Sequence, residues 1–315
     1  MIDLIVNILI ITISLVVLAS ASHFTIKSIE KLIELTGLSE ASAGFAILAV
    51  MTSTPEIIVA LFSVLQETPG ISIGDILGSN VFNVGVVLGI LGMLGFLKTC
   101  CTDLLVELTD VLFVISLIPL LLVVSHYHIF DVASPVVGAI LLGTFLISIF
   151  FMVKRRTPVV NASESAAARK ESRKKIIALF ILAVAAVIIA ARLVVSSGLN
   201  IALILGAPPI LIGAKVVAIG TSLPELTLDL AAVRRGRVQL AIGDIIGSNL
   251  TNLTLVLGLV LLTSPFAVDM TIFTEILPFL LITTIVFWRF LTKGGVSQVG
   301  GIILIMVYIL FQAVI

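Results

Sequence analysis

Long apolar runs, separated by short polar segments, dominate the sequence. Runs of about 20 residues are long enough for an α-helix that crosses a bilayer. Together with the polar segments between them, they predict ten transmembrane helices, near residues 2–21, 40–66, 71–97, 103–124, 131–153, 175–196, 209–233, 237–264, 270–290 and 296–315. The alternating apolar and polar residues of a transmembrane barrel are absent, so we predict an all-α polytopic membrane protein.

The composition agrees with this pattern and excludes a soluble domain. Of the 315 residues, 60 % are hydrophobic and 11 % are charged, and the mean hydropathy is +1.31. A soluble domain of this size cannot bury so much apolar surface. The first apolar run lacks a basic start and a small-residue cleavage site, and we therefore expect it to be a retained helix.

The basic residues fall almost entirely on one side of the predicted membrane. Sixteen Lys and Arg residues lie on the side of the connection at 154–174, whereas Arg192 lies opposite and Lys215 lies within an apolar run. Basic residues concentrate on the cytoplasmic side of membrane proteins. We therefore predict a multi-pass protein of the cell (plasma) membrane, with a cytoplasmic basic linker at 154–174 and both termini outside.

The two halves of the chain share a repeat at a constant offset. Residues 52–89 align without gaps on residues 221–258, an offset of 169, and 17 of the 38 aligned positions are identical. The identities include polar residues in register, since "TSTPE" aligns with "TSLPE" and "GDILGSN" aligns with "GDIIGSN". Chance similarity between apolar runs would match aliphatic residues but not this polar set.

An odd number of helices in each half predicts that the second half enters the membrane from the opposite side. We expect a first five-helix repeat at 1–153, with its motif at about 44–90, and a second at 175–315, with its motif at about 213–259. Inverted-topology repeats are typical of transporters that alternate access to a site at the bilayer midplane.

The repeated motif places a proline and a carboxylate in the middle of a predicted helix. Proline removes a backbone donor and frees carbonyl groups, which protein, water or an ion must then satisfy. An intramembrane carboxylate costs about 2.5–3.5 kcal/mol or more, and no basic residue at mid-membrane can pair with Glu56 or Glu225. Hydroxyl, carbonyl and carboxylate oxygens are ligands of hard cations such as Na⁺ and Ca²⁺. We predict that the two glutamates face each other across a cation.

The helix after each glutamate adds an Asp, a Ser and an Asn, spaced four residues apart and therefore on one face. These are Asp75, Ser79 and Asn83 in the first half, and Asp244, Ser248 and Asn252 in the second. Neighbouring glycines predict close helix packing. The Ser and Thr hydroxyls could instead bond to their own helix, and the two Asp residues could instead stabilise a helix start.

Asp229 lies one turn after Glu225, at a position where the first repeat has Ala60. Two interpretations are open for this carboxylate. It could serve as an ion relay on the cytoplasmic side of the site, or it could pair with Arg234.

With these motifs, the sequence resembles the calcium/cation antiporter superfamily, and within it the prokaryotic sodium/calcium exchangers. The pattern "GTSLPE…GDIIGSN…N" is similar to the alpha-repeat of that group, it occurs in both halves, and the ten-helix inverted layout covers the whole chain. The resemblance implies a secondary active antiporter, not an enzyme, that exchanges Na⁺ for Ca²⁺ by alternating access. It implies no cofactor, because Na⁺ and Ca²⁺ bind as substrates.

The resemblance also implies a set of metal-binding residues. Glu56 and Glu225 would bridge the central cations, and Asn83 and Asn252 would occupy the remaining corners. The hydroxyl and backbone groups of eight further residues would complete flanking Na⁺ sites. These are Ala49, Thr52, Ser53, Ser79, Ala218, Thr221, Ser222 and Ser248.

The chain departs from the family pattern at three positions. Asn252 stands where the family often has Asp, Met51 replaces a usual Gly, and Thr54 replaces a usual Leu. Two central carboxylates balance one Ca²⁺ or two Na⁺, so exchange of three Na⁺ for one Ca²⁺ would move one net charge. We favour this electrogenic mode because the flanking ligands are complete in both halves. Protons are expected to compete with the cations, because two facing glutamates repel each other when no cation separates them.

Other transport functions stay open. A Ca²⁺/H⁺ exchanger, or one that carries Mg²⁺ or K⁺, is the nearest alternative, although proton-driven relatives usually show a G-N-x-x-E motif that this chain lacks. A cation channel is less favoured, because no selectivity-filter loop or ring of charges is visible. We expect inorganic cations and the lipid bilayer as partners and no nucleic acid, and nothing in the sequence requires more than a monomer.

Overall fold

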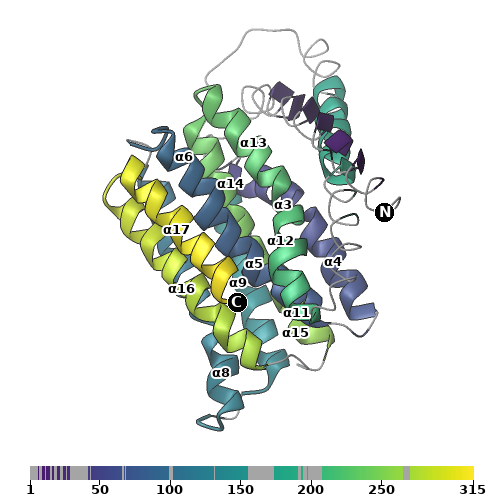
Figure 1. Cartoon of the computed structure of the whole chain (residues 1–315), viewed down its shortest axis with the longest axis vertical. Helices are drawn as coiled ribbons and strands as arrows, with labels where there is room; N and C mark the ends of the chain where they lie inside the picture. Colours follow the sequence, from purple (N-terminus) through teal and green to yellow (C-terminus); the bar gives the residue numbers. More distant parts are fainter. Residues whose placement is uncertain are drawn as a thin grey trace.

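The computed structural model of the chain is all-helical in the residues that it describes (Figure 1). These are scattered positions between residues 6 and 42, and residues 44–65, 67, 69–98, 102–130, 132–154, 174–190, 193, 197, 208–264 and 270–315. The first half contains η1 (Gly44–Leu48), α3 (Ala49–Thr52), α4 (Thr54–Leu65), α5 (Pro69–Phe82), η2 (Asn83–Leu88), α6 (Gly89–Met93), α7 (Asp103–Ser116), α8 (Leu120–His126) and α9 (Ser134–Lys154). The second contains α11 (Pro209–Ile212), η3 (Gly213–Val217), α12 (Ala218–Thr221), α13 (Leu223–Arg234), α14 (Val238–Thr251), η4 (Asn252–Val256), α15 (Leu257–Thr263), α16 (Met270–Thr292) and α17 (Gln298–Val314).

Six helical segments among the described residues are long and apolar enough to cross a membrane. They are Pro69–Met93, Asp103–His126, Ser134–Phe151, Ile210–Arg234, Val238–Thr263 and Met270–Thr292. Each coincides, within a few residues, with a predicted crossing, and the shorter apolar helix α17 lies at the predicted crossing near 296–315. Residues 174–190 are also helical. The predicted crossing at 2–21 and the linker lie largely outside the described residues, so the count of ten stays a prediction.

The helix bounds recur in the two halves at the same offset as the sequence repeat. The π-helices η1 and η3 are equivalent, and the short helices that follow them, α3 and α12, end at Thr52 and Thr221. A second pair of π-helices, η2 and η4, follows the equivalent helices α5 and α14. Such π-helical segments are rare and occur frequently at functional sites. The apolar pattern gave no indication of them.

Each motif interrupts its helix at a serine. Ser53 has φ −74° and ψ 4°, and Ser222 has φ −87° and ψ 3°, so neither continues the helix. Pro55 and Pro224 follow in the first turn of α4 and α13, where a missing N–H is tolerated. The proline that was predicted to disturb the helix therefore follows an interruption of the helix in both halves.

The central helices of the bundle are α5 and α14. In the apolar segments that contain them, 83 % of the most apolar 18-residue stretch is buried inside the bundle, compared with 17 % for the segment of α9. Helix α5 packs against α11, η3 and α12 of the second half, and α14 packs against η1 and α3 of the first half. Each central helix therefore contacts the interrupted motif of the other half. Helices α16 and α17 lie side by side at one face, where α17 contacts α6 and η2 (Figure 1).

The outer helices carry apolar side chains on their exposed surfaces. On α9, Leu146, Ile147, Phe150 and Phe151 are all more than half exposed. A contiguous apolar surface of this kind is unfavourable in water and favourable in hydrocarbon. The distribution of side chains therefore agrees with a protein whose outer helices face lipid.

Glycines allow the close contact between the two halves. A Cβ atom at Gly78 would lie 2.8 Å from Cβ of Ala218, and a Cβ atom at Gly247 would lie 2.6 Å from Cβ of Ala49. Both separations are shorter than real Cβ contacts, so only glycine fits at this distance. The two contacts occupy equivalent positions in the repeats, and they confirm the predicted close packing at Gly78 and Gly247.

We expect the substitution Gly247→Ala to lower the stability of the folded protein, because α14 would have to move away from Phe45 and Ala49. Overpacking of this kind costs about 1–3 kcal/mol. Gly143→Ala is the matched control, because a Cβ atom there meets nothing within 4 Å. Thermal unfolding of the purified variants measures the difference, and equal unfolding temperatures for the two would contradict the packing.

Candidate cation-binding site

Two glutamates, one from each half, lie completely buried between the central helices. Glu56 is in the first turn of α4 and Glu225 is in the first turn of α13, and both have 0 % exposed surface. The two side chains interact electrostatically. None of the four carboxylate oxygens has a hydrogen-bond partner among the described residues. The structure thus brings together the two acidic groups that the sequence predicted to face each other.

Two hydrogen bonds connect the halves beside the glutamates. The Thr221 hydroxyl donates to Asp75 Oδ1 at 2.9 Å, and the equivalent Thr52 hydroxyl donates to Asp244 Oδ1 at 3.3 Å. The Ser79 hydroxyl lies 3.3 Å from Asp75 Oδ1 and 3.2 Å from Thr221 Oγ1. All five side chains are buried, and Oδ2 of each aspartate has no hydrogen-bond partner. The two aspartates therefore belong to the polar cluster.

The alternative that these aspartates stabilise helix starts is wrong. Helix α5 begins at Pro69 and α14 begins at Val238, so Asp75 and Asp244 each lie six residues inside a helix. The favourable interaction with the helix dipole falls off within the first turn. Their contacts with threonines of the opposite half account for their burial instead.

Asparagines link α5 to α14 across the centre of the bundle. Nδ2 of Asn83 donates to Asn249 Oδ1 at 3.1 Å and to Ser248 Oγ at 3.3 Å. Nδ2 of Asn252 donates to Asn80 Oδ1 at 3.5 Å. Because each amide nitrogen is directed at the opposite helix, the Oδ1 atoms of Asn83 and Asn252 are left without a hydrogen-bond partner. These two oxygens are available to a ligand.

Asn80 and Asn249 were not among the residues predicted for the site. Both belong to the "GSN" segment that is identical in the two repeats, and this identity was the signal that could have revealed them. They act as partners of the other two asparagines and hold the orientation of those amides.

The serines and alanines of the predicted flanking sites are also buried here. The hydroxyls of Ser53 and Ser222 have no hydrogen-bond partner. The carbonyl of Ala49 accepts the N–H of Ser53 at 3.0 Å, and the carbonyl of Ala218 accepts the N–H of Ser222 at 3.1 Å. Each carbonyl also accepts a threonine hydroxyl, that of Thr52 at 3.2 Å for Ala49 and that of Thr221 at 3.4 Å for Ala218. A cation at either carbonyl would therefore take the place of this hydroxyl bond.

Unpartnered oxygens in a buried position are costly unless a ligand satisfies them. Within the part of the chain that the structure describes, no three Asp, Glu, His or Cys side chains converge as a metal centre on their own. A cation at the glutamates would therefore need hydroxyl, amide and carbonyl oxygens in addition. A donor set of oxygen atoms alone suits Na⁺ or Ca²⁺ rather than a thiophilic metal.

Asp229 does not pair with Arg234, so this alternative is wrong. Asp229 has 0 % exposed surface and both of its carboxylate oxygens lack a hydrogen-bond partner. Arg234 is exposed at the end of α13. Asp229 instead has Asp244 and Glu225 as electrostatic neighbours.

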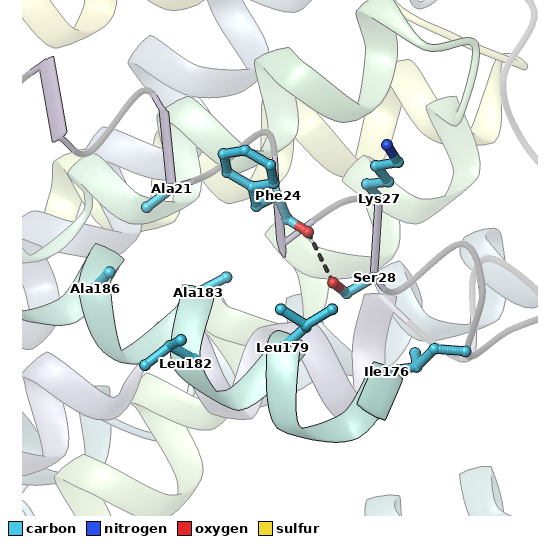
Figure 2. A pocket seen from close by; sticks show the side chains of 9 residues that line it. All are labelled: Ala21, Phe24, Lys27, Ser28, Ile176, Leu179, Leu182, Ala183 and Ala186. Carbon is cyan, nitrogen blue, oxygen red and sulfur yellow. Dashed lines mark hydrogen bonds between the residues drawn. The ribbon is translucent and has the colours of Figure 1, made fainter. Parts of the chain in front are cut away.

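A groove of about 480 Å³ lies elsewhere, between the N-terminal segment and the helix at 174–190 (Figure 2). Apolar side chains line most of it, together with Lys27 and Ser28, and the Ser28 hydroxyl donates to the carbonyl of Phe24 at 2.9 Å. None of the predicted site residues lines this groove. It is therefore separate from the polar cluster.

Comparisons with known proteins agree with this arrangement. The family described as "Sodium/calcium exchanger protein" matches residues 6–154 and again residues 175–315. The sodium/calcium exchanger MaX1 of Methanosarcina acetivorans is 31 % identical over 345 residues, which cover 98 % of each chain. The inner membrane protein YrbG of Escherichia coli is 28 % identical over 85 % of each chain. A shorter match, 36 % identical over 70 residues, involves 11 % of human sodium/potassium/calcium exchanger 4.

Solved structures of the sodium-calcium exchanger NCX_Mj share the fold. A structure soaked with 2.5 mM Na⁺ and 10 mM Sr²⁺ gives a TM-score of 0.82 at 25 % identity, over 99 % of both chains. A structure soaked with zero Na⁺ and Ca²⁺ gives 0.78 at 26 % identity, again over 99 % of both. Since the family match spans nearly all of this sequence, the chain belongs to the sodium/calcium exchanger family.

Proposed function

We propose that this protein is a secondary active antiporter that exchanges Na⁺ for Ca²⁺ across the cell membrane by alternating access. The observation that carries the proposal is the buried pair of Glu56 and Glu225, whose four oxygens have no hydrogen-bond partner in the part of the chain that the structure describes. One dehydrated Ca²⁺, or two Na⁺, between them would neutralise both. Membership of the exchanger family supports cation exchange as the general activity.

The arrangement of oxygens supports competition between the two ions for one site. Ca²⁺ takes six to eight oxygen ligands, and we propose that Glu56, Glu225, Asn83 and Asn252 supply the central ones. The flanking Na⁺ positions would use the remaining hydroxyl and carbonyl groups. These belong to Ala49, Thr52, Ser53, Ser79, Ala218, Thr221, Ser222 and Ser248. Since both ions require the same glutamates, each one displaces the other, and this displacement couples the two fluxes.

Two inverted five-helix repeats, at 1–153 and 175–315, would provide alternating access. The constant offset between helix bounds and the separate family match in each half support this division. In such an arrangement the interrupted helices of the two halves enter the membrane from opposite sides. Movement of one group of helices against the other would then expose the glutamates to each side in turn.

The proposal predicts saturable uptake of ⁴⁵Ca²⁺ into proteoliposomes that are preloaded with Na⁺ and diluted into Na⁺-free buffer. Vesicles that carry only a pH gradient are the control, and they should accumulate no ⁴⁵Ca²⁺. Uptake driven by the pH gradient alone would instead establish a Ca²⁺/H⁺ exchanger. Uptake that needs no counter-ion inside the vesicles would indicate a channel.

The short match to a sodium/potassium/calcium exchanger makes K⁺ the second cation to test. The same vesicles are assayed with and without K⁺ on each side, at a membrane potential clamped to zero. We expect the rate of Na⁺-driven ⁴⁵Ca²⁺ uptake to be independent of K⁺. A rate that requires K⁺ would replace the proposal by exchange of Na⁺ for Ca²⁺ together with K⁺.

A further inference from the structure

We propose that Asp229 and Asp244 form an additional binding position for a monovalent cation, beside the central glutamates and on the side of the second half only. This inference deepens the proposed function and rests on it. It concerns a buried group that the exchange of Na⁺ for Ca²⁺ at the glutamates does not use.

The position is built from two packed helices. Asp229 lies four residues after Glu225 on α13, and therefore one turn further along the same face. Helix α14, which carries Asp244, packs directly against α13. Both aspartates have 0 % exposed surface, and they are electrostatic neighbours. Two acidic groups thus approach each other in a region closed to water.

Three carboxylate oxygens at this position are unsatisfied. Both oxygens of Asp229 and Oδ2 of Asp244 have no hydrogen-bond partner. The remaining oxygen, Asp244 Oδ1, accepts the hydroxyl of Thr52 at 3.3 Å. Two adjacent buried carboxylates repel each other when both are ionised. A proton held between Asp229 and Asp244 would relieve this repulsion, whereas a cation between them would relieve it and satisfy all of these oxygens.

The chemistry of the position favours a hard monovalent ion. Its donors are carboxylate oxygens with the Thr52 hydroxyl nearby, and no third acidic, His or Cys side chain among the described residues converges with them as a metal centre. Ca²⁺ requires six to eight oxygens, more than this pair supplies. Na⁺ needs less charge compensation and suits the same type of donor.

The total charge of the buried acidic residues also favours a further bound cation. Among the described residues, five carboxylates have 0 % exposed surface: Glu56, Asp75, Glu225, Asp229 and Asp244. Each of these carboxylates that is ionised adds one negative charge, and three Na⁺ balance at most three of the five, whereas one Ca²⁺ balances at most two. A further bound cation therefore reduces the unbalanced charge in either loaded state.

The position is absent from the first half. Ala60 occupies the place of Asp229 there, and it is 4 % exposed. The first-half aspartate, Asp75, accepts the Thr221 and Ser79 hydroxyls at Oδ1. The first repeat therefore suggests the substitution Asp229→Ala, which gives the second half the residue that the first half has at the equivalent position.

Equilibrium binding of ²²Na⁺ to the purified full-length protein, without Ca²⁺, tests the proposal. We expect Asp229→Asn and Asp229→Ala to bind one Na⁺ fewer per chain at saturation than the wild type. Separate titrations with ⁴⁵Ca²⁺ should show that both variants still bind Ca²⁺. Gel filtration and the unfolding temperature verify that the variants are folded.

The possible results separate this inference from the proposed function. Equal numbers of bound Na⁺ in the wild type and the two variants would overturn the additional position. Loss of Ca²⁺ binding in a folded Asp229 variant would also overturn it, because Asp229 would then belong to the central site. A wild type that binds neither ion would instead contradict the proposed function itself.

Discussion

The substitutions Glu56→Gln and Glu225→Gln are each expected to lower Na⁺-driven ⁴⁵Ca²⁺ uptake by at least about 100-fold. Glutamine retains the size of the side chain and one acceptor oxygen but removes the negative charge. The effect follows from the loss of charge in a site that water does not reach, since both glutamates have 0 % exposed surface. A difference of about 2.5–3.5 kcal/mol for an intramembrane charge corresponds to a factor of about 100 in an equilibrium constant.

Either variant alone should be sufficient for this loss. Ca²⁺ between two glutamates is electrically neutral, whereas Ca²⁺ beside one glutamate leaves a net positive charge in a medium of low dielectric constant. Glu56 and Glu225 interact with each other electrostatically. Among the described residues, no basic side chain donates a hydrogen bond to either carboxylate. Asp75 and Asp244 lie nearby, but each is held by a threonine hydroxyl of the opposite half, so we expect neither to replace the lost carboxylate at the central position.

Glu275→Gln is the matched control for the change of Glu to Gln. Glu275 lies on α16 and is exposed, so its replacement should leave the rate of uptake close to that of the wild type. All three variants are reconstituted at equal density after gel filtration. Uptake by either central variant within about tenfold of the wild type would mean that the buried pair does not bind the transported Ca²⁺.

The elements of the fold that were predictable from sequence are those with a local signal. The apolar runs located α5, α7, α9 and α16 within a few residues, because burial in lipid requires a long apolar segment. The repeated T-S-x-P-E motif indicated where the helix hydrogen bonds are disturbed, because proline lacks a backbone donor, and the interruptions at Ser53 and Ser222 lie within this motif. The pairing of Glu56 with Glu225 followed from the repeat itself.

The features that sequence did not predict depend on contacts between the halves. The start of α5 at Pro69 lies in a polar segment, where the apolar pattern cannot fix a helix boundary, and Asp75 was therefore open to a helix-start interpretation. The partners of that aspartate and the orientation of Asn83 are set by residues more than 140 positions away in sequence. No local pattern reports such contacts.

The burial of Asp229 is another feature that depends on helix packing and was not predictable from the sequence. Arg234 follows five residues later, near the predicted end of the crossing, so an ion pair stayed open as an interpretation although side chains along a helix meet best at a spacing of three or four residues. In the structure the aspartate faces α14 and the arginine is exposed. The packing of α13 on α14 therefore places Asp229 among other buried acidic groups and away from the surface.

A membrane potential of 100 mV is expected to change the equilibrium Ca²⁺ gradient by about 50-fold at a fixed Na⁺ gradient. Exchange of three Na⁺ for one Ca²⁺ moves one net positive charge, which is worth about 2.3 kcal/mol per 100 mV. The flanking hydroxyl groups at Thr52 and Thr221 are present in both halves, and the buried Asp75 and Asp244 add negative charge beside them. These features favour a third Na⁺ despite the neutral Asn252.

The direction of the effect follows from the direction of the charge. In vesicles loaded with Na⁺, uptake of one Ca²⁺ and release of three Na⁺ carries one positive charge outward. A potential that is positive inside, set with valinomycin and an inward K⁺ gradient, should therefore raise ⁴⁵Ca²⁺ accumulation, and a potential that is negative inside should lower it. Accumulation that does not respond to potential would establish the electroneutral exchange of two Na⁺ for one Ca²⁺.

The same measurement reports on the cation proposed at Asp229. An ion that stays bound at Asp229 and Asp244 throughout the cycle adds no charge movement, and the shift remains about 50-fold per 100 mV. An ion that is carried with the other Na⁺ raises the net charge to two, and the shift becomes the square of that value. Comparison of the wild type with Asp229→Ala at one Na⁺ gradient therefore distinguishes a resident ion from a transported one.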